Sequence, residues 1–296
     1  AAADEPCPSK PIRWIVPLAA GGPADGIARM VAESLSKKLG QQIIIDNKAG
    51  AATNIGNAEA VRAAPDGYTI LYVMPSIVLN PGLFRVAVDP IKDLEPVAQM
   101  TSQAYVMMAR QGYAKSMPEI IDKARKDGVA CANGGGLPYF GCEWLRSLTK
   151  TDVLNAQFKG NGPAITALLG GHVDIMIDLF NTALPHIEAG SVGPIALTGE
   201  RRGEPLPKLP TVSETFPGFT LVGWHGVMAP KGTPAAIVQR LNKAIGEAME
   251  DPAVRKYFAD SHIDIARKTP AEFGQVIAAD LAKYAGIIRD AKIQKQ

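Results

Sequence analysis

The chain has 296 residues, of which 47% are hydrophobic and 20% are charged, and its formal net charge is +2. The length is about twice that of a typical domain, so we expect two α/β lobes or one large unit. Lysine and arginine are scattered, and so small a net charge excludes the basic surface that a nucleic-acid-binding protein requires. Because no apolar run approaches the roughly 20 residues of a transmembrane helix, no membrane span is expected.

The three cysteines do not predict a metal site. Cys7, Cys131 and Cys142 form neither a CxxC pair nor a Cys/His spacing, so we expect no metal and no cofactor. In an oxidising compartment Cys131 and Cys142 could close a short loop; otherwise both are packed thiols. The opening AAADEPCPSKP is typical of the residues that follow a signal-peptide cleavage site, which indicates export.

The start of the chain alternates apolar runs with helical patterns, as a parallel sheet requires. We expect strands at 12–16, 42–45 and 69–73. A loop of small residues and then a helix follow each of the first two strands. The first helix is predicted to end at Gly40, and the second before the turn signal PDGY.

The same alternation continues through the middle of the chain. The expected elements are strands at 105–109, 129–132, 173–177 and 194–198 and helices at 118–126, 139–149 and 162–169. The stretch ERRGEPLPKLPTVSETFPG favours a surface connection, and the chain from Thr233 onward is predicted to be helical.

We therefore predict two lobes. Residues 1–100 and 224–296 would form the first lobe and residues 101–223 the second. The chain is expected to cross between them near 99–103 and 219–223, and these crossings would act as hinges.

The two loops of the first lobe are the sharpest local signal. LAAGGPAD and DNKAGAATNIG each lie between a strand and the start of a helix. Such loops present unpaired backbone N–H groups beside the positive end of the helix dipole, so they attract carboxylate or phosphate. The alternative is that glycine only permits a tight turn there.

Catalytic and nucleotide-binding fingerprints are missing from the sequence. GxGxxG, GxxxxGK[ST], GxSxG and HExxH are all absent, and the four histidines lie far apart. Asp174 and Asp178 flank a strand and could form a carboxylate pair, and His225 adjoins Trp224 at a glycine-flanked position. Asp178 is interpreted either as a strand-end residue that faces a ligand or as a loop cap.

Several blocks together are more specific than any single loop. They are PLAAGGPADGIAR, DNKAGAATNIGNAEAVRAAPDGYTIL, FKGNGPAITALLGGHVDIMID, LTGERRGEPLPKLPTVSE and GWHGVMAPKGTPAAIVQRLNKAI. In this order and spacing the chain resembles the Bug (TctC-like) family, the extracytoplasmic solute receptors of tripartite tricarboxylate transporters. The resemblance extends from Pro11 through nearly the whole chain. It implies a type II periplasmic-binding-protein fold, with two α/β lobes around a ligand cleft.

The resemblance also implies which residues bind the ligand. In the family the first two strand-helix loops hold a carboxylate through backbone amides and ordered waters. The matching positions here are Ala20, Gly21, Gly22 and Asp25 in the first loop, and Gly50, Ala51, Ala52, Thr53 and Asn54 in the second. We expect Asp25 to serve the helix start or a water rather than the anion, because like charges repel. The second loop reads GAAT where the family more often has a GAGG-like form, which narrows its backbone freedom.

Further contacts are expected at the third strand and in the second lobe. The candidates are Ser76, Gly136, Asp178, Phe180 and Asn181. Pro138, Tyr139 and Phe140 predict an apolar wall, so an aromatic carboxylate is an alternative to a di- or tricarboxylate.

The family implies a monomeric periplasmic protein without catalysis, which hands its ligand to the membrane components of a tripartite tricarboxylate transporter. The alternative is an α/β enzyme acting on a small carboxylated or phosphorylated substrate, with Asp178 or His225 as its base.

Overall fold

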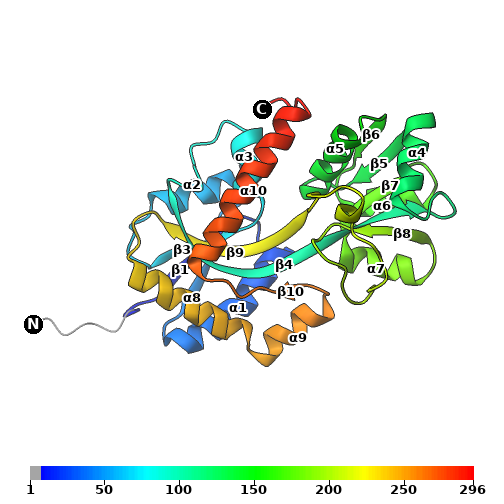
Figure 1. Cartoon of the computed structure of the whole chain (residues 1–296). Coiled ribbons are helices and arrows are strands. Elements are labelled where there is room, and N and C mark those ends of the chain that lie inside the picture. The colour runs from blue at the N-terminus through cyan, green and yellow to red at the C-terminus, as the bar shows by residue number, and fades with distance from the viewer. Residues whose placement is uncertain (1–7) are drawn as a thin grey trace, which may run out of the picture. The chain divides into compact units, whose positions relative to one another are not determined.

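The computed structural model describes residues 8–296 (Figure 1), so the expectations about the leading segment and Cys7 lie outside the described residues. The chain divides into two compact units. Unit 1 contains the chain up to Ser102 together with Trp224–Ile288 and Ile293–Gln296, and unit 2 contains Gln103–Gly223 and Arg289–Lys292. The chain passes between the units inside two strands, β4 (Leu94–Arg110) and β9 (Val222–Pro230).

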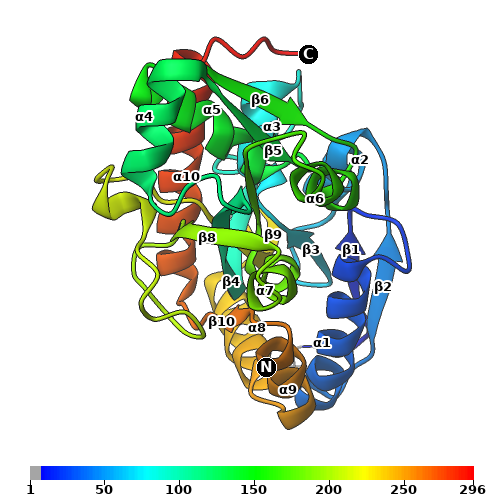
Figure 2. The same ribbon diagram turned by 90° about the vertical axis from the view of Figure 1, so that its right-hand side faces the viewer.

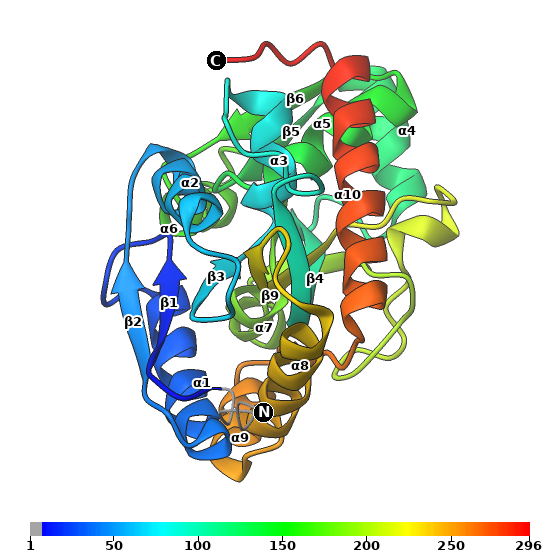
Figure 3. The same ribbon diagram turned by 90° about the vertical axis from the view of Figure 1, so that its left-hand side faces the viewer.

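Unit 1 contains a mixed sheet in the order β2-β1-β3-β9-β4. Its other elements are β1 (Ile12–Val16), α1 (Pro23–Leu39), β2 (Ile43–Asn47), the 3₁₀ turn η1 (Ala51–Thr53), α2 (Asn54–Arg62), β3 (Thr69–Val73), α3 (Ser76–Leu83), α8 (Ala235–Met249), α9 (Pro252–Asp260), β10 (Asp264–Ile265) and α10 (Pro270–Asp290). Strand β1 pairs in parallel with β2 and β3, so both neighbouring loops open at the same end of the sheet (Figure 3).

The core of unit 1 follows from the alternation of side chains along the strands. Ile12, Trp14 and Val16 of β1 lie on one face of the sheet and pack with the apolar stripes of α1, α8 and α9. The C-terminal helix α10 contributes Phe273, whose ring contacts the Trp224 ring edge to face at 5.3 Å.

Unit 2 contains a second sheet, in which β4, β7, β5 and β6 are neighbours and β8 pairs with β4. Figure 2 looks onto this unit and labels β5, β6 and β8. Its elements are α4 (Met117–Asp127), β5 (Val129–Asn133), α5 (Leu137–Thr149), β6 (Val153–Gln157), α6 (Asn161–Leu169), β7 (Ile175–Leu179), α7 (Phe180–Glu188), β8 (Val192–Leu197) and the 3₁₀ turn η2 (Val212–Glu214).

Two layers of helices cover the sheet of unit 2. Val106, Met108 and Met176 pack with residues of α6 and α7 on one face. On the other face α5 approaches closely at Gly141, where a Cβ atom would lie 2.7 Å from Ile177 Cδ1. A disulfide joins Cys131 of β5 to Cys142 of α5, with Cα atoms 5.9 Å apart, so the bridged alternative holds.

The expected α/β class is confirmed, and the strands at 12–16 and 69–73 have the predicted bounds. The helices α3 and α7 and the strands β6 and β10 were not predicted, and β9 was expected only as a crossing near 219–223. Strand β4 is also much longer than the predicted 105–109. Its polar residues Gln99, Thr101 and Gln103 are buried, and the hydroxyl of Thr101 accepts a hydrogen bond from the His225 amide. Polarity in this strand therefore reflects internal hydrogen bonds rather than solvent exposure.

Candidate functional site

The first loop of unit 1 joins β1 to α1 and ends at the helix N-cap, Gly22. Gly21 has φ +87°, a backbone conformation that favours glycine. Helix α1 begins at Pro23, so the next amides, those of Ala24 and Asp25, have no partner within the helix. These donors and the helix dipole make the loop attractive to an anion.

Asp25 organises the first loop from inside. Its side chain is 3% exposed and accepts hydrogen bonds from the Gly21 amide (2.9 Å), the Arg29 guanidinium (2.9 Å) and the Asn47 side-chain amide (3.0 Å). The Arg29 hydrogen bond, followed by that from Gly21, lowers the pKa of Asp25 to about 2. Because Asp25 already uses the Gly21 amide, an anion at this loop would meet other donors.

The first and second loops lie against each other. Asn47, at the end of β2, donates both to Asp25 and to the carbonyl of Leu18 at 3.0 Å. At Gly56, on the opening turn of α2, a Cβ atom would lie 2.7 Å from Pro17 Cβ, so glycine permits this close approach. One structural unit therefore brings the two predicted loops together.

The second loop has an unusual backbone. Gly50 has φ +125°, and the three residues after it, Ala51, Ala52 and Thr53, have φ of +49°, +51° and +77°. Each side chain in this region costs about 1–2 kcal/mol relative to glycine. Strained backbone of this kind concentrates at ligand-binding loops, so the geometry itself favours a functional role.

A buried polar network holds the second loop in this conformation. The hydroxyl of Thr53 lies 3.0 Å from that of Ser76 and accepts a hydrogen bond from the side-chain amide of Asn57 at 3.2 Å. The side-chain amide of Asn80, on α3, donates to the Ala52 carbonyl at 2.7 Å and to Asn54 Oδ1 at 3.0 Å. The network brings together three predicted site residues, Thr53, Asn54 and Ser76.

Asn57 and Asn80 were not among the predicted site residues. Both side chains are buried, at 2% and 4% exposure. In the sequence, Asn80 directly follows the apolar run IVL, shortly after the third strand. A polar residue next to such a run is the signal that could have indicated its role.

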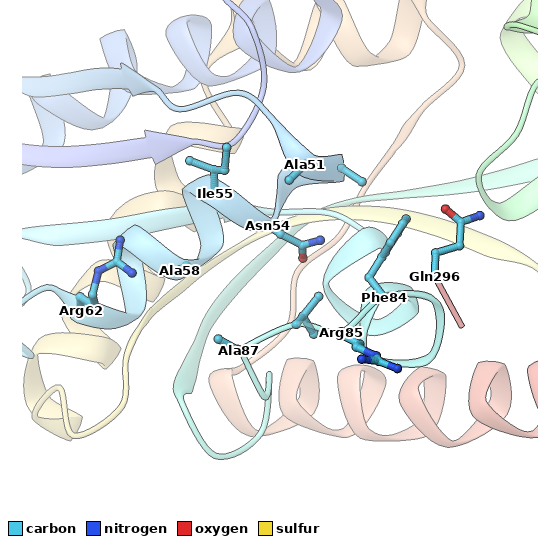
Figure 4. A pocket seen from close by; sticks show the side chains of 11 residues that line it. Ala51, Asn54, Ile55, Ala58, Arg62, Phe84, Arg85, Ala87 and Gln296 are labelled. Atoms are coloured by element: carbon cyan, nitrogen blue, oxygen red, sulfur yellow. The ribbon is translucent and has the colours of Figure 1, made fainter. Parts of the chain in front are cut away.

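A pocket of about 690 Å³ opens beside the second loop, wholly within unit 1 (Figure 4). One wall contains Ala51, Ala52 and Asn54 of the loop, and the α2 face continues it. The other wall is the segment 84–87.

The predicted residue Gly136 of unit 2 is the N-cap of α5, with φ +66°. Two residues earlier, at Gly134, a Cβ atom would lie 2.1 Å from Asn161 Oδ1, so this loop packs tightly on the start of α6. The predicted apolar wall is wrong for Pro138 and Phe140. Both are buried, because this turn of α5 faces the interior, and Tyr139 is only half-buried.

Asp178 lies near the end of β7, with 2% of its surface exposed. Its oxygens accept hydrogen bonds from Asn161 Nδ2 (2.6 Å), the Leu179 amide (2.7 Å) and the Thr182 hydroxyl (2.8 Å). Burial raises the pKa of Asp178, against the lowering effect of Thr182 and Leu179. These partners make Asp178 a residue that positions the starts of α6 and α7.

Phe180 and Asn181 form the first turn of α7. The Phe180 side chain is 8% exposed and packs in the core of unit 2, whereas Asn181 is half-buried. The side chain of Asn181 is therefore more accessible than those of Asp178 and Phe180, the other predicted side-chain contacts in unit 2.

The residues considered for catalysis have structural partners. Asp174 accepts from Arg110 Nε at 3.0 Å and from the Ala130 amide at 2.9 Å. His225 Nδ1 lies 2.6 Å from the Tyr72 hydroxyl, and burial lowers the pKa of this histidine to about 4. His225 is therefore neutral at pH 7.

Residues 8–296 hold no group of three or more His, Cys, Asp or Glu side chains placed to bind a metal ion. Within the same range, every helix is too short or too polar to cross a lipid bilayer.

Comparison with known proteins identifies the chain's relatives. The model of the tripartite tricarboxylate transporter family receptor matches residues 27–293. The protein BugT of Bordetella pertussis is 33% identical over 96% of this chain and 90% of its own.

Solved structures agree with this match. A TctC solute-binding protein from Polaromonas has a TM-score of 0.89 and 26% identity, over 96% of this chain and 99% of its own. MatC of Rhodopseudomonas palustris, solved with bound malate, has a TM-score of 0.73 and 30% identity, over 95% of this chain and 99% of its own. The expected periplasmic-binding-protein fold and the resemblance to the Bug (TctC-like) group are thus confirmed, and the chain belongs to the family of tripartite tricarboxylate transporter receptors.

Proposed function

We propose that this receptor holds one carboxylate group of its ligand on the two loops of unit 1. The observation that carries the proposal is the pairing of these loops at one end of parallel strands, beside the starts of α1 and α2. The ends of parallel strands are the usual ligand sites of α/β sheets. The amides of Ala20 and Gly22 and of residues 50–53 are the proposed donors, and the Asn54 amide already donates to the Ala51 carbonyl.

The attraction comes from neutral donors and helix ends rather than from a cation. Lys48 precedes the second loop, but its ammonium group is 3.8 Å from Asp46 and 3.6 Å from Glu59. Arg29 donates to Asp25. A helix terminus contributes about 0.3–1 kcal/mol, and about 2 kcal/mol when partly buried, so two termini and several hydrogen bonds are sufficient.

Roles within the site follow from the hydrogen bonds already made. Asp25, Thr53 and Ser76 shape the loops, because their side chains are engaged with other residues. In unit 2 we propose Gly136 and Asn181 as contacts for the rest of the ligand, with Asp178 and Phe180 supporting them.

The proposed ligand class is a small aliphatic dicarboxylate, with tricarboxylates and aromatic carboxylates as the alternatives. MatC, a family relative, was solved with malate. Pro138 and Phe140 are buried, so neither offers an apolar surface to an aromatic ring. An aliphatic ligand is therefore favoured over an aromatic one.

We further propose that the protein acts as a monomer in the periplasm and passes its ligand to the membrane components of a tripartite tricarboxylate transporter. It has no catalytic role in this proposal. Binding requires only oriented donors. Asp178 is occupied by hydrogen bonds at the starts of α6 and α7, and His225 by the Tyr72 hydroxyl.

A thermal-shift screen with mono-, di- and tricarboxylates and aromatic acids tests the proposal. A ligand at about 100 times its Kd adds roughly 2.7 kcal/mol to the free energy of unfolding. Calorimetry should then give saturable binding, and the ligand should be recovered unchanged. Equal binding of the acid and its methyl ester would contradict the proposed anion site. Chemical conversion of the ligand would establish the enzyme alternative.

A further inference from the structure

The pocket beside the second loop has features that the carboxylate loops do not use. Its volume of about 690 Å³ falls within the range of roughly 300–1,000 Å³ that small-molecule sites occupy. It lies between one face of α2 and the segment 84–87, so it is a groove within unit 1.

The charges of the pocket are one-sided. Arg62, at the end of α2, and Arg85 both line it, and no lining side chain is an aspartate or glutamate. Gln296 also lines the pocket, and its carbonyl accepts a hydrogen bond from the Arg85 amide at 3.3 Å. Among residues 8–296, neither guanidinium takes part in an ion pair, and both side chains are exposed. Arg62 lies at a helix C-terminus, where the helix dipole favours a positive charge. Arg85 lies outside any helix, so the dipole does not account for its charge.

The surface between the two arginines is apolar. Ile55, Ala58, Phe84 and Val86 contribute to it, and Ile55 is 50% exposed. Figure 4 shows Arg62 at one end of the pocket, on the same helix as Ile55 and Ala58, and Arg85 beside Phe84 on the facing segment. Covering this surface would remove Ile55 from water.

We propose that this pocket is a second binding site, specific for amphipathic organic carboxylates. The hydrocarbon part lies over Ile55 and Phe84, and a carboxylate pairs with Arg62 or Arg85, because guanidinium groups bind carboxylates with two parallel hydrogen bonds. This site recognises its ligand with formal cations, in contrast to the proposed carboxylate loops. Because Ala51, Ala52 and Asn54 of the second loop also line this pocket, the two arginines are what distinguish the second site from the loop site.

An NMR titration of the ¹⁵N-labelled protein with hexanoate, adipate and hexane-1,6-diol tests the site. The amides of Ile55, Ala58 and Val86 should shift saturably with one or both acids, with a Kd of about 1 mM or tighter. The diol should cause no saturable shift. If adipate binds more tightly than hexanoate, and this difference persists in Gly21→Ala but is lost when either arginine is removed, both arginines pair with one ligand.

Charge-removal variants decide which residues hold the anion. The double variant Arg62→Gln/Arg85→Gln should weaken binding by about tenfold or more. Arg240→Gln is the matched control, because Arg240 is also an exposed arginine of unit 1 on α8. It should leave the affinity unchanged.

Three results would overturn the proposal. One is the absence of saturable shifts around the pocket, and another is equal binding of the diol. The third is binding that survives the double arginine variant but is lost in Gly21→Ala, since it would then belong to the carboxylate loops. Circular dichroism of each variant checks that the fold is retained.

Discussion

The two loops of unit 1 reach a similar kind of backbone by different means. In the first loop, positive φ falls on Gly21, where the conformation carries no steric cost and an added Cβ atom would meet open space. In the second loop, positive φ falls on Ala51, Ala52 and Thr53 as well as on Gly50. The backbone conformation of the first loop is therefore one that its glycine adopts readily, whereas that of the second loop has to be held by the surrounding residues.

The difference lies in what restrains each loop. Asp25 accepts the Gly21 amide and Asn80 donates to the Ala52 carbonyl, so each loop has one buried polar anchor. Only the second anchor has to oppose backbone strain. A loop held in this way is preorganised, and preorganisation adds to affinity because less conformational freedom is lost on binding.

The largest effect is expected from Asn80→Ala. Truncation leaves the Ala52 carbonyl and Asn54 without their buried donor, which costs about 1–3 kcal/mol of unfolding free energy. The strained loop should then relax, and carboxylate affinity should fall by about tenfold or more. Denaturant unfolding and calorimetry measure the two effects.

Asn242→Ala is the matched control for Asn80→Ala. The Asn242 side-chain amide likewise donates to two acceptors of unit 1, the carbonyls of Val97 and Lys268, at 2.8 and 2.9 Å. It should lower stability without changing affinity. Equal affinities in the two variants would mean that Asn80 does not hold the ligand loop.

The anchor of the first loop should appear as a pH dependence. The pKa of Asp25 is about 2 in the folded protein and 3.8 ordinarily, so the unfolded state binds the proton first. The stabilisation is complete above pH 3.8 and is lost as the pH falls from 3.8 through 2. Asp25→Asn should flatten the fall of unfolding free energy in this window, while the exposed Asp290→Asn should not. An unchanged slope in Asp25→Asn would contradict the role of Asp25 as the anchor.

Gly21→Ala tests the intrinsic freedom of the first loop. A side chain at φ +87° should cost about 1 kcal/mol of unfolding free energy, although no neighbouring atom obstructs it. Carboxylate affinity should fall, because the amides next to Gly21 would be reoriented. Gly26→Ala, inside α1 and also facing open space, should retain both stability and affinity.

The sequence predicted the strands and helices whose apolar residues follow a regular period. Strand β1 and helix α1 were found because apolar periodicity and the terminator Gly40 are local signals. The positions of the first and second loops followed from the same pattern. The strain in Ala51 and Ala52 could not be predicted, because it depends on Asn80, which lies 28 residues beyond Ala52.

Other errors have the same physical origin. Helix α3 contains Pro81 and was not predicted, since proline inside a helix removes a backbone donor. Phe140 was expected at the ligand wall, but the rotation of α5 turns it into the core. Which face of a helix is buried depends on packing partners that are distant in the sequence.

The opposite change in the second loop should have the opposite sign. Ala52→Gly removes a side chain at φ +51° but adds freedom to the unfolded chain, so the unfolding free energy should rise by at most about 1 kcal/mol. Affinity should stay the same or fall slightly, because Asn80 still holds the carbonyl. A loss of stability equal to that of Gly21→Ala would show that the second loop is not strained.

The smallest effect is expected from Lys48→Ala, although Lys48 is the cation next to the second loop. Its ammonium group is already near Asp46 and Glu59, and its side chain is 36% exposed. Exposed ion pairs contribute about 0–1 kcal/mol, so both stability and carboxylate affinity should change by only a few-fold. The same protein should still reject the methyl ester of its ligand, because the loops select the anion through oriented amides and helix ends. Calorimetry of Lys48→Ala with the acid and the ester measures both. A roughly hundredfold loss with the acid would mean that the lysine, and not the backbone of the two loops, holds the carboxylate.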